Sequence, residues 1–259
     1  MSPSLRVQVG KLARRSISRT LRQPILVLPN VVLPLFLLAV LTSGNKQVTQ
    51  IPGFPTKSYV TFVLGASLVQ GAAAAMTIAG NALGSDIETG FLSRLALTPV
   101  RGSALIGAQL AGVTVLGVAQ GVLYLLVGLA FGAHVKAGVG GAFVVIAIVL
   151  LMVLAFGAIG LFAAVRMGSA QQTQALLPLA LGLLFMSSMF MPRNLIKAHW
   201  FRDIATYNPL SYLVEAPRSL FVDGWDGEAL ALGCAVAAAI LVAALAAAGT
   251  SMKTRLLRT

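Results

Sequence analysis

Charged residues are scarce in this chain, and acidic residues are the scarcest of them. Only 10% of the 259 residues are charged, with 19 lysines and arginines against 7 aspartates and glutamates. The chain is 58% hydrophobic with a mean hydropathy of +0.89, so it has too little polar surface to enclose its apolar residues in water. This balance excludes an ordinary soluble domain and predicts an all-α integral membrane protein.

Cysteine and histidine, the residues that build disulfide frameworks and metal sites, are nearly absent. The single cysteine, Cys234, excludes an intramolecular disulfide framework. His134 and His199 have no acidic or cysteine partner at metal-ligand spacing, so we expect no metal site and no catalytic group. No lysine follows the glycine-rich pattern that binds phosphates, which predicts that the chain binds no nucleotide and no other cofactor itself.

The positive charge of the chain is distributed as in membrane proteins. The net charge is +12, but the basic residues flank apolar stretches and are not interleaved with aromatic residues. We therefore expect contact with membrane lipids and no binding of nucleic acid. A helix needs about 20 apolar residues to cross the hydrocarbon core. Six stretches meet this length without a charged residue, and they predict spans at about 24–43, 59–83, 104–131, 140–164, 171–191 and 229–250, within a transmembrane domain of residues 23–252.

The two ends of the chain predict its orientation. Residues 1–22 combine six basic residues with apolar residues on one helical face, which predicts an amphipathic helix at the cytoplasmic membrane surface. A cleaved signal peptide is the alternative, but the basic region is long and no clear cleavage site follows it. Six crossings return the basic tail, residues 253–259, to the cytoplasm, so both termini are expected there. The outer segment 192–228 departs from this charge rule, since it also holds four basic residues.

The segment that follows the second span predicts a short cytoplasmic helix. Asp86 and Glu88 suit a helix amino terminus, Arg94 lies nearer its carboxyl end, and Pro99 ends it. Phe91 contributes to an apolar ridge that would be exposed in the cytoplasm, and such a ridge indicates a partner. A connector lying on the lipid headgroups is the alternative reading.

Polar residues in the spans are candidates for a translocation path. Gln70, Thr77 and Asn81 fall close to one face of the second span, although hydrogen bonds between helices would explain them equally. Gln174, Phe185 and Met189 in the fifth span raise the same possibility, with core packing as the alternative for the methionine. No ionisable residue lies well inside a span, which disfavours a proton- or ion-coupled carrier.

The outer segment predicts short broken helices before the last span. Its aromatic residues suit the membrane interface, and Glu215 and Arg218 stand three residues apart, where they can pair on a helix. The residues that we expect to shape this outer cap are Pro192, Asn208, Pro209, Glu215 and Arg218.

Over nearly its whole length the chain resembles the permeases of type-2 ABC exporters, particularly the daunorubicin-resistance type that exports drugs and lipids. Three features carry the resemblance: the pattern of Asp86, Glu88, Gly90, Thr98 and Pro99, the Pro192 turn, and the run Asn208-Pro209-Leu210 followed by Arg218. The sequence departs from the family where a second proline is missing near Lys197–Trp200 and where Pro217 interrupts the run into Arg218.

The resemblance implies how such a protein works. The loop after the second span would be a coupling helix that docks on a separate ABC ATPase subunit, which would carry ATP and Mg²⁺. The coupling candidates are then Asp86, Glu88, Gly90, Phe91, Arg94, Thr98 and Pro99. Two permeases, as a homodimer or heterodimer in the plasma or inner membrane of a prokaryotic cell, would enclose a path for hydrophobic drugs, including multidrug efflux, or for lipids or lipid-linked molecules. Export of polysaccharide or glycolipid is an alternative within the family, and a passive channel or a secondary transporter is an alternative outside it.

Overall fold

The computed structural model describes residues 10, 13–18, 24–91, 94 and 102–256, and within these residues all regular structure is helical. Residues 13–18 form a short helical segment that precedes the main bundle. The further helices are α2 (Pro24–Gly44), η1 (Lys46–Gln50), α3 (Tyr59–Glu88), α5 (Gly102–Ala130), α6 (Gly138–Met167), α7 (Ala170–Gln174), α8 (Leu176–Phe185), η2 (Arg193–Leu195), α9 (His199–Tyr207), α10 (Pro209–Val222) and α11 (Gly227–Leu256).

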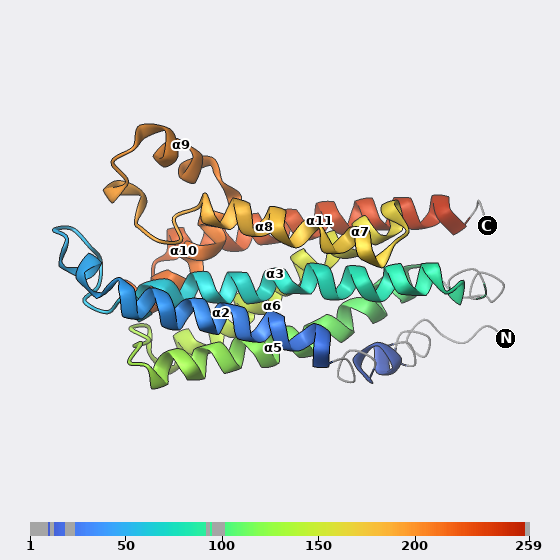
Figure 1. The fold of residues 1–259 in the computed structure, drawn as a ribbon, viewed down its shortest axis with the longest axis horizontal. Helices are drawn as coiled ribbons and strands as arrows, with labels where there is room; N and C mark the ends of the chain where they lie inside the picture. The colour runs from blue at the N-terminus through green and yellow to red at the C-terminus, as the bar shows by residue number, and fades with distance from the viewer. Residues whose placement is uncertain (1–9, 11–12, 19–23, 92–93, 95–101, 257–259) are drawn as a thin grey trace.

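The long helices run side by side along the longest axis of the molecule (Figure 1). Within the described residues, α3, α5, α6 and α11 are long and apolar enough to cross a membrane, and α2 contributes a shorter apolar helix over residues 28–44. These lengths confirm the predicted all-α membrane fold. The number of spans stays a prediction.

Helix α3 is the centre of the bundle, and 94% of its most apolar 18-residue stretch is buried. It packs against α2, α5, α6 and α10. Small residues allow this close packing of helices. Gly160 of α6 lies so near α3 that a β-carbon there would overlap the carbonyl oxygen of Met76. The bundle therefore depends on glycine at the point where α3 and α6 meet.

Helix α2 contains two internal prolines, and the structure shows how the second is tolerated. Pro34 has no N–H, so it cannot donate the helical hydrogen bond to the carbonyl of Asn30 four residues earlier. Two side chains of α5 take its place: the Tyr124 hydroxyl donates to Asn30 O at 3.0 Å, and Gln120 Nε2 donates to the same oxygen at 2.8 Å. The buried carbonyl is thus satisfied by a neighbouring helix, as in many membrane proteins.

The predicted fifth span, 171–191, is not a continuous helix. The chain forms α7, turns at Ala175, forms α8 and leaves the helical conformation after Phe185. Pro178 explains the break, because it cannot donate to the carbonyl of Gln174 and its ring crowds that carbonyl. The apolar stretch 171–191 is therefore built from two helices, and its role as a fifth span stays a prediction.

The bundle has two distinct ends (Figure 1). We name one the Asp86 end: here α3, α6 and α11 finish, α5 and α7 begin, and the segment 13–18 packs. The other is the Arg218 end, which contains η1, η2, α9 and α10 and the starts of α3, α6 and α11. The alternation of helix directions puts the segments predicted to be cytoplasmic at one end and those predicted to be outside at the other.

Candidate functional site

At the Asp86 end, α3 continues further than predicted. The sequence placed Asp86 and Glu88 at the start of a separate helix, but both lie in the last turn of α3, which ends at Glu88 with Thr89 as its cap. No residue between 83 and 88 interrupts the helix, and the chain turns only at Gly90, whose φ of +66° favours glycine. A carboxylate at this position is disfavoured by the helix dipole, so Asp86 needs compensation from elsewhere.

Two other segments supply that compensation by meeting α3 at the Asp86 carboxylate, which is only 2% exposed. Arg15 of the segment 13–18 donates from Nη2 to Oδ1 at 3.0 Å, and Gln109 of α5 donates from Nε2 to Oδ2 at 3.0 Å. The Ser16 hydroxyl donates to Gln109 Oε1 at 3.0 Å, which closes the network. The last turn of α3 is therefore bonded to both the amino-terminal segment and α5.

Glu88 makes the connection to a fourth segment. Its Oε1 accepts the backbone N–H of Ala170 at 3.0 Å, at the first residue of α7. Gly84 lies against the same residue, since a β-carbon there would come 2.6 Å from Ala170 N. Further along the same helix, the Thr173 hydroxyl donates to Asn81 Oδ1 at 3.0 Å. Helix α7 is thus held to α3 by side chains and by close backbone contact.

The remaining coupling candidates follow the turn. Phe91 is half-buried, with the Arg15 guanidinium 3.8 Å above its ring, and Arg94 is exposed. Thr98 and Pro99 lie outside the described residues. A surface that another protein can reach is therefore present at Phe91 and Arg94, whereas Asp86 is buried beneath it.

At the Arg218 end, Arg218 is 6% exposed and is bonded to backbone carbonyls. Its guanidinium donates to Phe62 O at 2.9 Å, to Ser188 O at 2.8 Å and to Met189 O at 2.9 Å, and it lies 3.7 Å from the centre of the Phe62 ring. Ser188 and Met189 belong to the turn that follows α8, so Arg218 fastens this turn to the start of α3.

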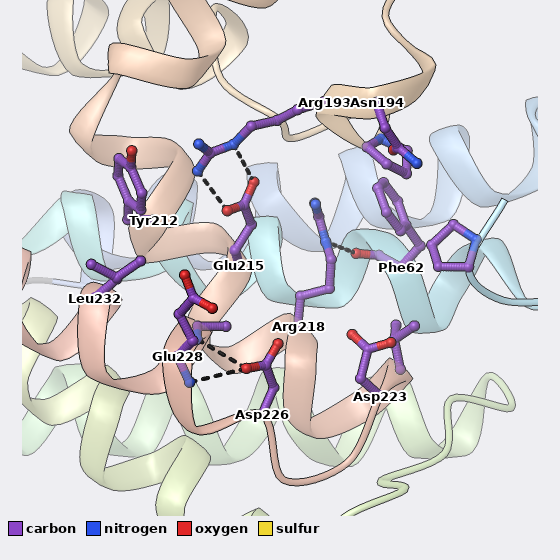
Figure 2. Close-up of a pocket in the computed structure, with 14 residues that line it drawn as sticks. Phe62, Arg193, Asn194, Tyr212, Glu215, Arg218, Asp223, Asp226, Glu228 and Leu232 are labelled. Carbon is purple, nitrogen blue, oxygen red and sulfur yellow. Dashed lines mark hydrogen bonds and ion pairs between the residues drawn. The ribbon is translucent and has the colours of Figure 1, made fainter. Parts of the chain in front are cut away.

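The predicted pairing of Glu215 with Arg218 is wrong. Glu215 instead forms a two-pronged ion pair with Arg193, whose Nε lies 2.7 Å from Oε1 and whose Nη2 lies 2.5 Å from Oε2. Ser188 also donates to Glu215 Oε1 at 2.6 Å. The Arg218 guanidinium is bonded to the carbonyls of Ser188 and Met189 and to that of Phe62, the bond drawn in Figure 2, so it is not paired with Glu215.

Asn208 and Pro209 start α10. The Asn208 side chain accepts the N–H of Leu210 at 2.9 Å as an amino-terminal cap, and Pro209 occupies the first helical position, where its missing N–H costs nothing. Asn208 Nδ2 donates to Leu183 O at 2.6 Å, so the same side chain holds α10 to α8.

An open pocket of about 590 Å³ lies between the Arg193–Glu215 pair, Arg218 and the start of α11 (Figure 2). Pro192 lines it together with Arg193, Glu215 and Arg218, and Asp223, Asp226 and Glu228 form its other wall. Burial raises the pKa of Asp223, the charge of Asp226 raises it further, and Lys136 opposes both. Three of the five predicted outer-cap residues, Pro192, Glu215 and Arg218, therefore line one pocket, and Asn208 and Pro209 lie outside its lining.

A sequence model of the ABC-2 type transporter family matches residues 7–222, most of the chain. The chain belongs to the ABC-2 transporter family. It is thus the multi-pass membrane subunit of an ABC transporter, the kind of permease that pairs with an ABC ATPase subunit. A search of curated proteins finds no match.

If the path lies between this chain and a second permease, the residues that line it must reach the surface of the single chain. Gln70, Thr77 and Met189 do not, because they are 4%, 5% and 1% exposed. The Thr77 hydroxyl donates to Ala74 O, and Asn81 is bonded to Thr173, which is the interhelical role considered as the alternative. These contacts favour the interhelical role, and a part for Gln70, Thr77, Asn81 and Met189 in a path stays a prediction. Gln174 and Phe185 are exposed.

Three residues of the candidate site were missed in the sequence. Arg15 and Gln109 lie 71 and 23 residues from Asp86, and no periodicity relates them. Arg193 had a local signal, because it follows Pro192 directly and shares the outer segment with Glu215, a carboxylate that a half-buried arginine can pair with.

Proposed function

We propose that this chain is the permease of an ATP-driven exporter in a prokaryotic cell membrane, with the Asp86 end and both termini in the cytoplasm. It would form the path with a second copy or a related permease. ATP and Mg²⁺ would bind to the separate ATPase subunit, and this chain would hold no cofactor of its own. The proposed cargo is a hydrophobic drug, a lipid or a lipid-linked molecule.

The distribution of basic residues supports this orientation. Arg14, Arg166 and Lys253 are exposed at the Asp86 end, as the positive-inside rule requires. At the Arg218 end, Arg218 is buried on backbone carbonyls and Arg193 is paired with Glu215. Segment 192–228 therefore departs less from the positive-inside rule than its sequence suggests, because two of its four basic residues make internal contacts.

The observation that carries the proposal is the set of bonds around the last turn of α3. Asp86 joins the segment 13–18 and α5, Glu88 joins α7, and Phe91 and Arg94 follow directly on the surface. A force applied by an ATPase at Phe91 would therefore reach several helices through rigid contacts. This arrangement fits a permease that is moved mechanically, as expected where the spans lack ionisable groups.

The cargo class is proposed from the surface that α7 and α8 present. Leu179, Leu183 and Phe185 are 66%, 51% and 43% exposed, and α8 contains no charged residue. Three exposed amides, Gln171, Gln172 and Gln174, lie toward the Asp86 end. Amides facing hydrocarbon are unfavourable, so this face suits contact with water or a second subunit. Such a surface, apolar over most of its length, supports an amphiphilic cargo.

The proposal is tested by co-expressing the chain with candidate ABC ATPases, starting with any encoded by a neighbouring gene. The expected result is a stable complex with vanadate-sensitive ATP turnover in proteoliposomes. Phe91→Ala should lower that turnover about tenfold, as for loss of roughly 1.4 kcal/mol of contact energy, because it removes the apolar group presented to the ATPase. The matched control is Tyr207→Ala, an aromatic residue 86% exposed at the Arg218 end, which should leave turnover unchanged.

Two results would overturn this proposal. If no ATPase co-purifies, the chain works without one and passive flux becomes the alternative to measure. If Phe91→Ala and Tyr207→Ala have equal effects, the loop after α3 does not couple to the ATPase.

A further inference from the structure

The Arg15 side chain touches two groups that would move together during coupling. Its guanidinium is bonded to Asp86 of α3, and the same group lies 3.8 Å from the centre of the ring of Phe91, which follows the turn after α3. Guanidinium is suited to this double contact, because its edge donates hydrogen bonds while its face stacks on an aromatic ring. Arg15 therefore bridges the end of α3 and the first residue of the surface loop.

The segment that carries Arg15 is itself held firmly to α5. Ser16 is 7% exposed and donates to Gln109 Oε1, while Gln109 donates to Asp86. Gly112 of α5 lies against Ser16, so closely that a β-carbon at position 112 would overlap the Ser16 hydroxyl. The segment 13–18 thus sits in a fitted position between α5 and the end of α3.

These contacts have a mechanical consequence. Arg15 is 42% exposed while its partner Asp86 is 2% exposed, so the pair lies at the protein surface with the carboxylate beneath. A buried carboxylate that loses its cation is strongly destabilised, so Asp86 and Arg15 tend to move as one unit. Any displacement of Phe91 also shifts the guanidinium stacked on it.

We propose that Arg15 is a positioning residue that transmits movement of the loop after α3 to the amino-terminal segment 13–18. The inference rests on the proposed function, since an ATPase must move the loop. It goes beyond that function by assigning the amino-terminal segment a moving role, in which the Arg15 guanidinium links it directly to α3, beside the indirect link through Ser16 and Gln109. In this account the exposed neighbour Arg14 has no part in transmission, because of these two arginines it is Arg15 that is bonded to Asp86 and lies over Phe91.

The test places an environment-sensitive fluorophore on the assembled complex in nanodiscs, with Cys234→Ala to make each label unique. One label is at Ser18→Cys, exposed on the segment 13–18, and the other is at Thr89→Cys, exposed at the end of α3. The fluorescence of each label is compared between the nucleotide-free complex and the complex trapped with ATP and vanadate. We expect both labels to change on trapping in the parent chain.

Arg15→Gln should reduce the fluorescence change at position 18 at least about tenfold, as expected for loss of a hydrogen-bonded charged contact. The fluorescence change at position 89 should stay as in the parent chain. Arg15→Lys keeps the charge but loses the planar fork, so it should give an intermediate change. Arg14→Gln, the matched control, should behave as the parent chain. If Arg15→Gln prevents assembly of the complex, the milder Arg15→Lys variant decides.

Each other outcome has one meaning. If position 18 still responds fully in the Arg15 variants, or never responds while position 89 does, Arg15 transmits nothing and the inference fails. If position 89 is silent in the parent complex, the loop is not moved by the ATPase, and the proposed function fails with it.

Discussion

Replacing Arg218 by alanine is expected to produce one of the two largest losses of stability in this protein. The carbonyls of Ser188 and Met189, in the turn after α8, would lose the guanidinium that satisfies them. An unsatisfied buried carbonyl costs about 1 to 3 kcal/mol, so two cost about 2 to 6 kcal/mol. The lower part of this range applies if water enters from the adjoining pocket.

The measurement is the thermal unfolding of the purified protein in detergent. A melting temperature at least about 4 °C lower is expected for Arg218→Ala, taking about 2 °C for each kcal/mol. The melting temperature of Arg218→Lys should lie between those of the parent protein and Arg218→Ala, because one ammonium group cannot reach all the carbonyls. Arg202→Ala is the control at the same end, since Arg202 contacts His199 on the surface. Equal melting temperatures for the Arg218 and Arg202 variants would contradict the role assigned to Arg218.

Adding one methyl group at Gly160 is expected to have a comparable effect. A β-carbon at this position would overlap the carbonyl oxygen of Met76, and a backbone carbonyl cannot move aside without moving α3. Overpacking of this kind costs about 1 to 3 kcal/mol, and the upper value is expected here because a whole helix must shift. The displacement would also disturb the contacts of α3 with α7, which begin one turn further along.

Gly107→Ala provides the matched control for Gly160→Ala. Gly107 lies in α5 with nothing within 4 Å of an added β-carbon. Alanine there should stabilise the helix by about 0.5 to 1 kcal/mol, because it restricts the unfolded chain. The two variants carry the same chemical change, so opposite shifts in melting temperature are expected. A Gly160→Ala protein as stable as Gly107→Ala would show that α3 and α6 do not meet as described.

Much of the fold followed from hydropathy, because the requirement for about 20 apolar residues acts on each span separately. The ends of α2, α5 and α6 lie within three residues of the predicted bounds, whereas α11 continues to Leu256, six residues past the predicted 250. The fifth stretch was less predictable, since it is apolar throughout and only Pro178 marks the break between α7 and α8. The extension of α3 to Glu88 was missed because charged residues were taken to end the membrane helix, whereas Arg15 and Gln109 stabilise Asp86 within it.

The candidate site was predicted where neighbouring residues define it and missed where distant segments meet. Asn208 and Pro209 form a local cap, and local sequence is enough to predict one. The partner of Glu215 was misassigned because spacing along α10 favours Arg218, but burial directs Arg218 to backbone carbonyls. The path assignment is a related case. Spacing shows that Gln70 and Thr77 share a face of α3, but it does not show that this face is buried inside the single chain, so their part in a path stays a prediction.

Site-specific photo-crosslinking tests most directly whether an ATPase moves this permease through the loop after α3. A photoreactive phenylalanine analogue would replace Phe91 at the Asp86 end or Tyr207 at the Arg218 end, in membranes that also contain the ATPase. We predict a crosslinked product with the ATPase from position 91 and none from position 207. A product from position 207, or none from position 91 in a complex that co-purifies, would contradict the account.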